Sequence, residues 1–511
     1  MAVCPVSLRY PLLFYLPLYV VAVLGANKAL TVEQLILYCI ITGIRNVYFS
    51  ELRKFPGPKL WAASHLPFMW TLCTGNQAAK VLELHEKYGK VVRVTPNELS
   101  YASASAWKDV WGHRQGHAEF MKANTVPLPN GVRGILGARR ADHARFRRLL
   151  SHAFSERGMK EQQKTIQEFV DLLIERLRQN ASNGSLDMVQ WLNWTTFDVI
   201  GKLAFGEAFG CLKNQEMHPW IKAVFDNLRA TIVIQALKRV QMDFIVPLLA
   251  KFSSAQKQRM FNGKYASDKI EERVKHGEQG DFWDNVLKQS AASNGEKGMT
   301  VEEMKSNAAN LVLAGSETTA TLLSGTMYML LTHPDAMKQI TSEIRGFFAS
   351  SDDIDLFSVS KLKYTLAVLD ETMRIYPPVP TQAARLVPKG GDTVEGKYLP
   401  EGTIIQLPQY PAYHLSSNFK KPFEFHPERF LGAEEFQDDE FCVLQPFSFG
   451  PRNCIGRNLA YSEMRLILAK LLYNFDFELD EKTGDWTGVQ KTYILWEKPS
   501  MWVRVKPVAK A

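Results

Sequence analysis

The sequence contains few cysteines, and their arrangement excludes most of the usual roles of this residue. Six occur among 511 residues, and they lie singly: Cys4, Cys39, Cys73, Cys211, Cys442 and Cys454. A small secreted domain held by disulfides needs a denser framework of cysteines. Zinc and iron–sulfur sites need CxxC spacing or Cys/His clusters, and the sequence has neither. Cysteine chemistry in this chain therefore depends on a single thiol.

The chain also lacks internal repeats, low-complexity tracts and clusters of basic residues. The net charge is +8, but lysine and arginine are interspersed with acids. Without a basic stripe or a recognition motif, we expect no nucleic-acid partner. The excess positive charge suits an anionic membrane surface or an acidic protein. Because 46% of the residues are hydrophobic and the composition is even after the N-terminal region, we expect one large catalytic domain.

Only the N-terminal region has a long uncharged apolar run. It covers residues 10–27 and reads PLLFYLPLYVVAVLGA in its middle, which is long enough to cross a bilayer as a tilted helix. Arg9 precedes it and several basic residues follow it, so the positive-inside rule places the remainder in the cytosol. A cleaved signal peptide is the alternative, but a second apolar stretch follows at residues 35–44. We expect an uncleaved single-pass anchor and linker over residues 1–50 and a catalytic domain over residues 51–511. Whether residues 35–44 also enter the membrane stays open.

The segment around Cys454 has a distinctive composition, and it reads Phe447-Ser-Phe-Gly450-Pro-Arg452-Asn-Cys454-Ile-Gly456. Gly450 and Gly456 suit backbone angles closed to other residues and let a flat ligand approach the main chain. Arg452 supplies a cation that favours the thiolate. The residues from 458 onward predict a helix, whose N-terminus favours negative charge as well. From these residues alone an inert loop cysteine, a nucleophile with a distant histidine and an axial haem thiolate all stay open.

The decamer fits the pattern F-x-x-G-x-R-x-C-x-G, and the chain thereby resembles the cytochrome P-450 superfamily of haem-thiolate monooxygenases. Three further segments match the same family in the same order: AGSETT at 314–319, ETMR at 371–374 and PERF at 427–430. The runs VPKGG at 387–391 and IYPP at 375–378 resemble fungal members that oxidise secondary metabolites. The resemblance begins near residue 50. It implies a mainly α fold with a small β subdomain, preceded by an N-terminal transmembrane helix at the cytosolic face of the endoplasmic reticulum.

The resemblance also implies an activity. Haem b, an iron protoporphyrin IX with Cys454 as its axial thiolate and only protein metal ligand, would activate dioxygen with electrons from an NADPH-cytochrome reductase. One oxygen atom would enter a hydrophobic small molecule of the polyketide, terpenoid or alkaloid kind. We further expect contact with membrane lipid and a monomeric protein. A haem-thiolate isomerase or dehydratase that needs no reductase, and a non-enzymatic haem-binding sensor, are the alternatives. The apolar substrate pocket is expected from residues 107–126, Leu311 with Ala314, 379–383 and 490–494.

Apolar spacing predicts a mostly helical domain. Three- and four-residue repeats indicate helices over residues 77–88, 141–154, 160–179, 220–239 and 255–275. The longest begins at Thr300, where Glu303 completes a capping box, and ends at His333-Pro334. At helical rise it spans roughly 45 Å. Strand patterns occur at residues 91–101 and 382–407, the latter divided by glycine-containing turns.

The longest predicted helix contains Gly315, a residue that helix interiors disfavour by about 1 kcal/mol relative to alanine. Either a small-residue face packs against another helix, or a local distortion opens a groove in the backbone ladder. Oxygen activation needs two protons, which an acid and an alcohol can relay through water. By resemblance, Glu317 is the acid and Thr318 the alcohol. Ala314 and Gly315 would flank the oxygen site.

Glu371 and Arg374 are three residues apart, so they lie on one helix face and can pair directly. At a surface such a pair contributes little to stability. The resemblance implies instead a buried triad completed by Arg429, in which loss of one member leaves a charge uncompensated. The implied role of the triad is structural, namely to hold the loop that contains Cys454.

The resemblance finally assigns the residues that contact haem. Arg452 and Arg385 would bind its propionates, together with His143 and Arg147 of the segment DHARFRR. The family usually has tryptophan where this chain has His143, but a histidine can still donate a hydrogen bond to a carboxylate. Arg145 and Arg148 would face an acidic reductase, and Phe447 would pack against the sulfur. The expected cofactor-binding set is Cys454, Arg452, Phe447, Gly450, Gly456, Arg385, His143, Arg147, Ala314 and Gly315.

Overall fold

The computed structural model describes residues 32–123, 131–240, 242, 245, 255–292, 298–381 and 383–508. Among the helices in these ranges, none has both the length and the apolar character needed to cross a bilayer. The membrane span predicted at residues 10–27 lies outside the described residues. The second apolar stretch, 35–44, lies within helix α2 (Val32–Tyr48).

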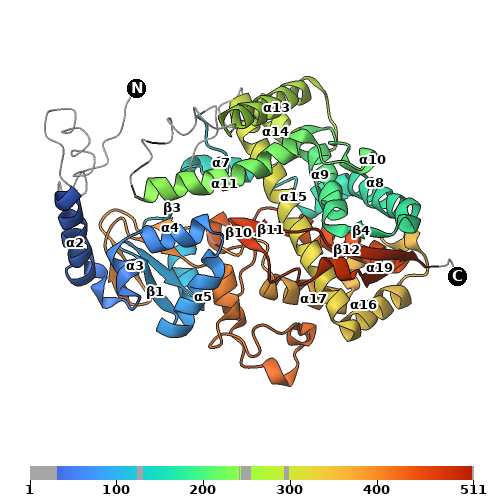
Figure 1. The fold of residues 1–511 in the computed structure, drawn as a ribbon. Coiled ribbons are helices and arrows are strands. Elements are labelled where there is room, and N and C mark those ends of the chain that lie inside the picture. Colours follow the sequence, from blue (N-terminus) through green and yellow to red (C-terminus); the bar gives the residue numbers. More distant parts are fainter. Residues whose placement is uncertain are drawn as a thin grey trace.

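The larger part of the molecule is helical and is arranged around one long helix, α15 (Figure 1). This helix covers Val301–Thr332 and packs against five others. These are α9 (Met188–Phe205), α13 (Ala255–Lys275), α16 (Pro334–Phe347), α17 (Lys363–Ile375) and α19 (Arg457–Asn474). The remaining longer helices are α4 (Leu66–Cys73), α5 (Gln77–Tyr88), α7 (Arg140–Leu150), α8 (Glu156–Asn180), α11 (Pro219–Arg239) and α14 (Trp283–Ala292).

A five-stranded sheet with the order β1-β2-β8-β5-β3 forms the second part of the fold. Its strands are β1 (Val91–Thr95), β2 (Glu98–Tyr101), β3 (Met121–Lys122), β5 (Arg385–Leu386) and β8 (Ile404–Gln406). The pairing of β2 with β8 is parallel, and the other pairings are antiparallel. Arg385 of β5 is paired with Ile405 of β8.

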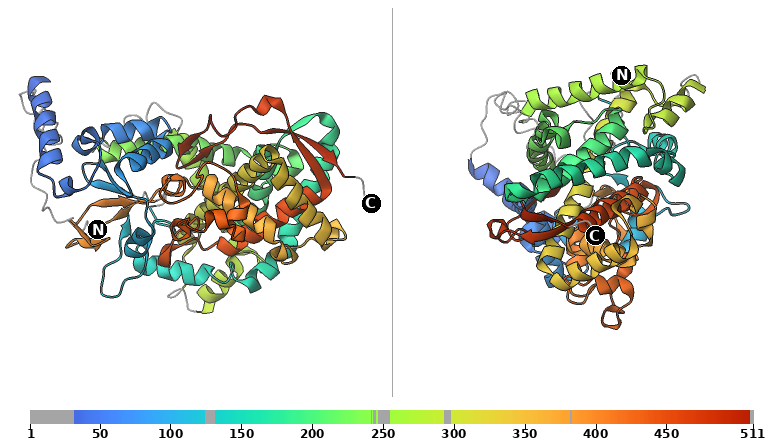
Figure 2. Two further views of the ribbon diagram at one scale, coloured as in Figure 1. Left: turned by 90° about the horizontal axis from the view of Figure 1, so that it is seen from below. Right: turned by 90° about the vertical axis from the view of Figure 1, so that its right-hand side faces the viewer.

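Three smaller sheets contain the other strands of the described residues. β6 (Asp392–Val394) pairs with β7 (Lys397–Leu399), and β10 (Lys491–Tyr493) pairs with β11 (Leu495–Glu497). The third sheet has the order β4-β12-β9, formed by Ser185–Asp187, Trp502–Pro507 and Phe475–Leu479. Figure 2 shows α2 and the five-stranded sheet at one end of the molecule and the sheet with β12 at the opposite end.

The mainly α fold with small sheets agrees with the sequence prediction. The predicted helices 77–88 and 255–275 are α5 and α13 with unchanged bounds. Thr300 and Glu303 form the predicted capping box, and α15 ends at Thr332, directly before His333-Pro334. The sequence patterns did not identify α9. Nearly all of its residues are buried, so no apolar face alternates with a polar one.

Two hydrophobic clusters contain most of the core. The larger lies among α8, α9, α15, α17 and α19, and the smaller lies under the five-stranded sheet. Trp107 belongs to the smaller cluster: it is 1% exposed and its indole N–H donates to the Val443 carbonyl at 2.9 Å. Trp107 is therefore a core residue, while the contribution of residues 107–126 to a substrate pocket stays a prediction.

Candidate active site

The loop that contains Cys454 makes a tight turn before α19. Cys454 lies two residues before Gly456, the N-cap of that helix, and its N–H donates to the Phe447 carbonyl at 2.8 Å. Gly450 has a φ of 73°, and a Cβ there would lie 2.0 Å from the Trp111 carbonyl oxygen. Only glycine fits this position, as predicted. Gly456 has a φ of −85°, so the prediction of a special backbone conformation there is wrong.

The thiol of Cys454 is accessible but is set into the protein. The side chain is exposed, whereas burial raises the pKa of its thiol, opposed by the N–H of Gly456 and the cation of Arg147. Arg147, and not Arg452 as expected from the sequence, is the cation that acts on the sulfur. Burial thus favours the thiol, whereas coordination to a metal cation would favour the thiolate.

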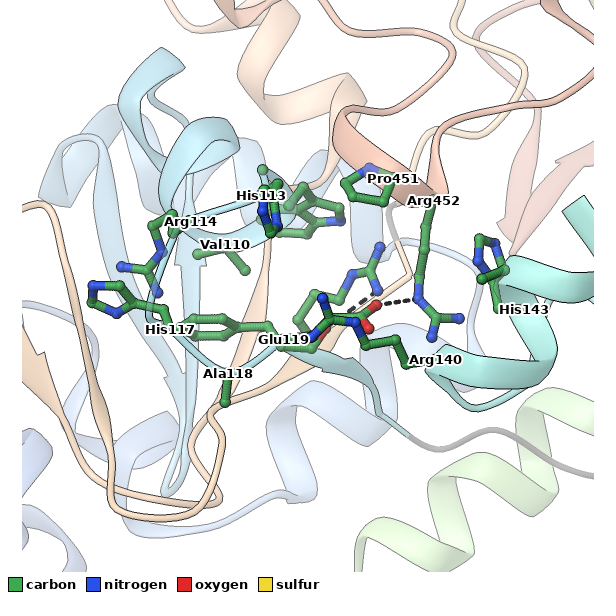
Figure 3. Close-up of a pocket in the computed structure, with 15 residues that line it drawn as sticks. Val110, His113, Arg114, His117, Ala118, Glu119, Arg140, His143, Pro451 and Arg452 are labelled. Carbon is green, nitrogen blue, oxygen red and sulfur yellow. Dashed lines mark hydrogen bonds and ion pairs between the residues drawn. The ribbon is translucent and has the colours of Figure 1, made fainter. Parts of the chain in front are cut away.

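A pocket beside this loop is lined by several basic side chains. Figure 3 shows Arg452 pointing toward Glu119, with Arg140 and His143 on the same side of the pocket. The lining comes from the segment after Trp107, from β5, from α7 and from the cysteine loop. It consists of Val110, Trp111, Gly112, His113, Arg114, His117, Ala118, Glu119, Phe120, Arg140, His143, Ala144, Arg385, Pro451 and Arg452.

The cations of this pocket have too few anionic partners. Arg452 forms an ion pair with Glu119 and donates to the Ala138 carbonyl at 2.9 Å. Arg385 is 3% exposed, and its Nε donates no hydrogen bond. Burial and the charge of Arg452 lower the pKa of Arg385 to about 10. Burial, Arg385 and Arg452 lower the pKa of Lys122 to about 8.

His143 shares this environment, and the pKa of its imidazole is lowered to about 4, first by burial and then by Arg452 and Arg147. A neutral imidazole can donate one hydrogen bond to a carboxylate. The donor set therefore fits a ligand with two carboxylates, such as the haem propionates implied by the sequence. The pattern-based prediction included Arg452, Arg385 and His143 but missed Glu119 and Lys122, because their segment was interpreted only as apolar pocket lining.

Helix α7 directs its arginines differently from the prediction. Arg147 does not line the pocket: it donates to the carbonyl and the side-chain Oδ1 of Asn453, at 2.6 and 2.5 Å. It thus fixes the residue directly before Cys454. Arg145 pairs with Glu303 at 2.6 Å within the protein, and its contact with a protein partner stays a prediction. Arg148 is exposed.

The AGSETT segment lies within α15, and its side chains point to different sides. Ala314 is exposed, and the Thr318 hydroxyl donates to the Ala314 carbonyl at 2.6 Å. A Cβ on Gly315 would lie 2.7 Å from Ile200 of α9. The helix is continuous through this glycine, so the predicted distortion is absent and close helix packing explains the residue. Glu317 is buried on another side of the helix, where it forms an ion pair with Lys498.

Glu371, Arg374 and Arg429 meet in the interior, and all three side chains are completely buried. The two oxygens of Glu371 accept from Arg374 at 2.7 and 2.8 Å, and one of them accepts from Arg429 at 3.2 Å. Arg429 also pairs with Asp439, a residue that the sequence patterns did not indicate. Arg374 donates to the Pro422 and Glu424 carbonyls at 2.7 and 2.9 Å, so the cluster fixes the chain ahead of the cysteine loop.

Phe447 lies at the start of the cysteine loop. Its carbonyl accepts from the Cys454 N–H, and its ring packs against Tyr461 with centroids 5.1 Å apart. The Tyr461 hydroxyl donates to Asp370 at 2.7 Å. The backbone of Phe447 thus positions the cysteine, while its ring packs on Tyr461, the residue that joins α19 to α17.

Comparison with known proteins relates this site to one family. The model of the family "Cytochrome P450" matches residues 56–504. The chain is 45% identical to an averantin hydroxylase of Dothistroma septosporum over 93% of this chain and 90% of that protein. It is 45% identical to a versicolorin B desaturase of the same organism over 91% of each chain. It is 43% identical to the cytochrome P450 monooxygenase astA of Talaromyces wortmannii over 92% and 95% of the two chains.

Proposed function

The chain belongs to the cytochrome P450 family, and on this premise we propose that Cys454 is the axial ligand of its haem. The protein is a haem-thiolate monooxygenase that oxidises a small molecule, as its fungal relatives do. Its cofactor is haem with a cysteine ligand, and this family uses dioxygen and electrons from a reductase. When bound, the haem supplies the activation of dioxygen.

The proposal rests chiefly on one observation: the basic pocket and the loop of Cys454 share Arg452. This arginine lines the pocket and is two residues from the cysteine. Arg452, Arg385 and His143 would bind the haem carboxylates there. Arg147 would hold the cysteine loop through Asn453, and the Glu371 triad would hold the chain before it. We propose that Gly450, Gly456 and Phe447 set the backbone geometry of the loop itself.

The residues on the other side of the cofactor would transfer protons and exclude water. Thr318, whose hydroxyl is held by the Ala314 carbonyl, would keep a water molecule in place at the oxygen site. Glu317 would supply protons through water. Ala314 would form the apolar wall, and Gly315 would let α15 approach α9 closely. If Thr318→Ala retains fully coupled turnover, this relay is refuted.

We further propose an arrangement at the endoplasmic reticulum membrane, with residues 1–50 as anchor and linker and residues 51–511 as a cytosolic catalytic domain. Exposed apolar side chains on α2 support a position against lipid: Ile36, Leu37, Ile40, Ile41 and Ile44 are about half exposed. Leu66 and Trp70 of α4 are exposed as well. An NADPH-cytochrome reductase would dock near the exposed Arg148 and deliver the electrons.

For the substrate, we propose a hydrophobic secondary metabolite of the polyketide, terpenoid or alkaloid kind, taken up by a monomeric enzyme. The names of two relatives specify averantin and versicolorin B, so these compounds are the first to test here. Untargeted comparison of metabolites from a host with and without the gene identifies the substrate as the precursor that accumulates in its absence.

The carbon monoxide difference spectrum tests the ligand assignment directly. The reduced complex should show the red-shifted Soret band of thiolate-bound haem, and Cys454→His should lose the shift while retaining haem. Cys442→His is the matched control, since Cys442 is an exposed cysteine twelve residues earlier. An unshifted band in the unaltered protein, or an unchanged band in Cys454→His, contradicts the assignment.

A further inference from the structure

Lys498 and Glu317 form an ion pair that is almost completely buried. The two side chains are 4% and 2% exposed. The Lys498 ammonium group donates to Glu317 Oε1 and, at 2.7 Å, to the Thr321 hydroxyl. Thr321 lies one turn after Glu317 on α15, and its hydroxyl donates to the same carboxylate oxygen at 3.3 Å. One oxygen of Glu317 is therefore held from two sides.

The second oxygen of the same carboxylate has no such support. Glu317 Oε2 is buried and accepts no hydrogen bond from the residues that the structure describes. Leaving an acceptor of a charged group unsatisfied in the interior is unfavourable, because the group loses its solvation without gaining a partner. A pair with a purely structural role gains nothing from this asymmetry. Oε2 is the oxygen that remains for a water molecule.

Lys498 reaches Glu317 from a firmly held segment at the far end of the sequence. It follows β11 directly, and Trp496 of that strand donates to the Pro377 carbonyl at 2.8 Å and stacks on Tyr376 at 4.9 Å. On the other side, the Pro499 carbonyl accepts from Trp486 at 2.9 Å. The lysine backbone is fixed on both sides, so its ammonium group has a defined position.

From these contacts we propose that Lys498 is a positioning residue for the proton donor Glu317, an inference that rests on the monooxygenase function proposed above. Lys498 and Thr321 hold Oε1, and this orients Oε2 as the single oxygen that exchanges protons with water. Glu317, a carboxylate in the ion pair, accepts at Oε2 a proton that bulk water delivers as hydronium and passes that proton to the water at the oxygen site, so its charge is unchanged after a cycle. Lys498 touches neither substrate nor haem in this scheme and acts only through the carboxylate.

Three variants test the proposal in the haem-loaded enzyme with its reductase. Lys498→Met removes the ammonium group and keeps the chain length. We expect product formed per NADPH consumed to fall about tenfold, because a displaced proton donor loses its alignment. Lys498→Arg keeps the cation and should recover most of the coupling. Lys470→Met is the control: Lys470 is also buried and paired, at 2.8 Å with Asp171, but contacts no residue of the relay. It should leave coupling unchanged.

A second readout needs no turnover. Without its cation, buried Glu317 should bind a proton at neutral pH. Lys498→Met should then show an infrared carboxylic-acid band that the double variant Glu317→Gln/Lys498→Met lacks. If the monooxygenase function itself fails, this band still reports on the pairing of Lys498 with Glu317, so the two failures can be distinguished.

The charge exchange Glu317→Lys/Lys498→Glu separates positioning from stability. It should restore the thermal stability lost in Lys498→Met, because the ion pair is reformed. It should not restore the coupling, because the carboxylate then extends from the segment after β11 and not from α15. Coupling that stays at the unaltered level in Lys498→Met overturns the proposal, with or without the infrared band. Coupling restored by the charge exchange overturns it as well.

Discussion

Glu463 gives a prediction whose size can be worked out from its surroundings. It lies within α19, is 5% exposed, and burial alone raises its pKa from 4.5 to about 8. The folded protein therefore keeps this proton up to about pH 8, whereas the unfolded chain releases it near pH 4.5. Between these values the unfolded state binds fewer protons, so stability falls as the pH rises. At pH 7 the loss from this one group is about 3 kcal/mol.

Replacing Glu463 by glutamine removes the titration and nearly preserves the shape of the side chain. Glu463→Gln should unfold about 3 °C higher than the unaltered protein at pH 7, given the unfolding entropy of a chain of this size. At pH 5 the difference should nearly vanish. Thermal unfolding of the haem-loaded protein, followed by circular dichroism from pH 5 to 8, measures both values. Glu478→Gln is the control, because Glu478 is an exposed residue of β9 paired with Lys506. A Glu463→Gln variant with the same pH dependence as the unaltered protein refutes the reasoning.

Two further changes test the packing around the cysteine loop. Gly450→Ala should abolish haem incorporation, because the added Cβ would lie 2.0 Å from the Trp111 carbonyl oxygen and φ is positive. Gly456→Ala should retain haem, because its added Cβ would have its nearest contact at 3.7 Å. Equal Soret absorbance per protein in the two variants contradicts this difference. Glu371→Gln should lower the free energy of unfolding by about 3–5 kcal/mol, because Arg374 and Arg429 lose a shared buried anion. Urea unfolding measures the loss, and a loss below about 1 kcal/mol, the value typical of a surface pair, contradicts the triad.

The sequence predicted those features that depend on neighbouring residues. The capping box of Thr300 and Glu303, the stop at His333-Pro334 and the bounds of α5 follow from local patterns, and the structure has them as predicted. The direct pairing of Glu371 with Arg374 follows from helical spacing in the same way. Family resemblance placed Arg429 beside them, which spacing alone could not do.

The features that failed or were missed depend on contacts between distant segments. Lys498 is 181 residues from Glu317, and nothing near either residue marks the pair. The same is true of Glu119 and Arg452, which are 333 residues apart. Local composition suggested that Arg452 acts on the sulfur, but the fold turns it to Glu119 and brings Arg147 toward the thiol. Gly315 shows the converse. The sequence indicates that a glycine is unfavourable at this helical position, but only the fold shows that close contact with Ile200 requires it.

The sheet β4-β12-β9 can form completely only after β12 has been synthesised. Its middle strand, β12, is the last strand in the residues that the structure describes, and Trp502 pairs with Asp187, which emerges from the ribosome more than three hundred residues earlier. At typical translation rates this interval is of the order of half a minute. Throughout that time β4 has no partner on the side that β12 will cover, and Asp187 Oδ1 lacks the N–H of Met501. A chain that stops before residue 502 leaves β4 and β9 without their common neighbour. A chain in which β12 has not yet been made is thereby distinguishable to chaperones by an open strand edge.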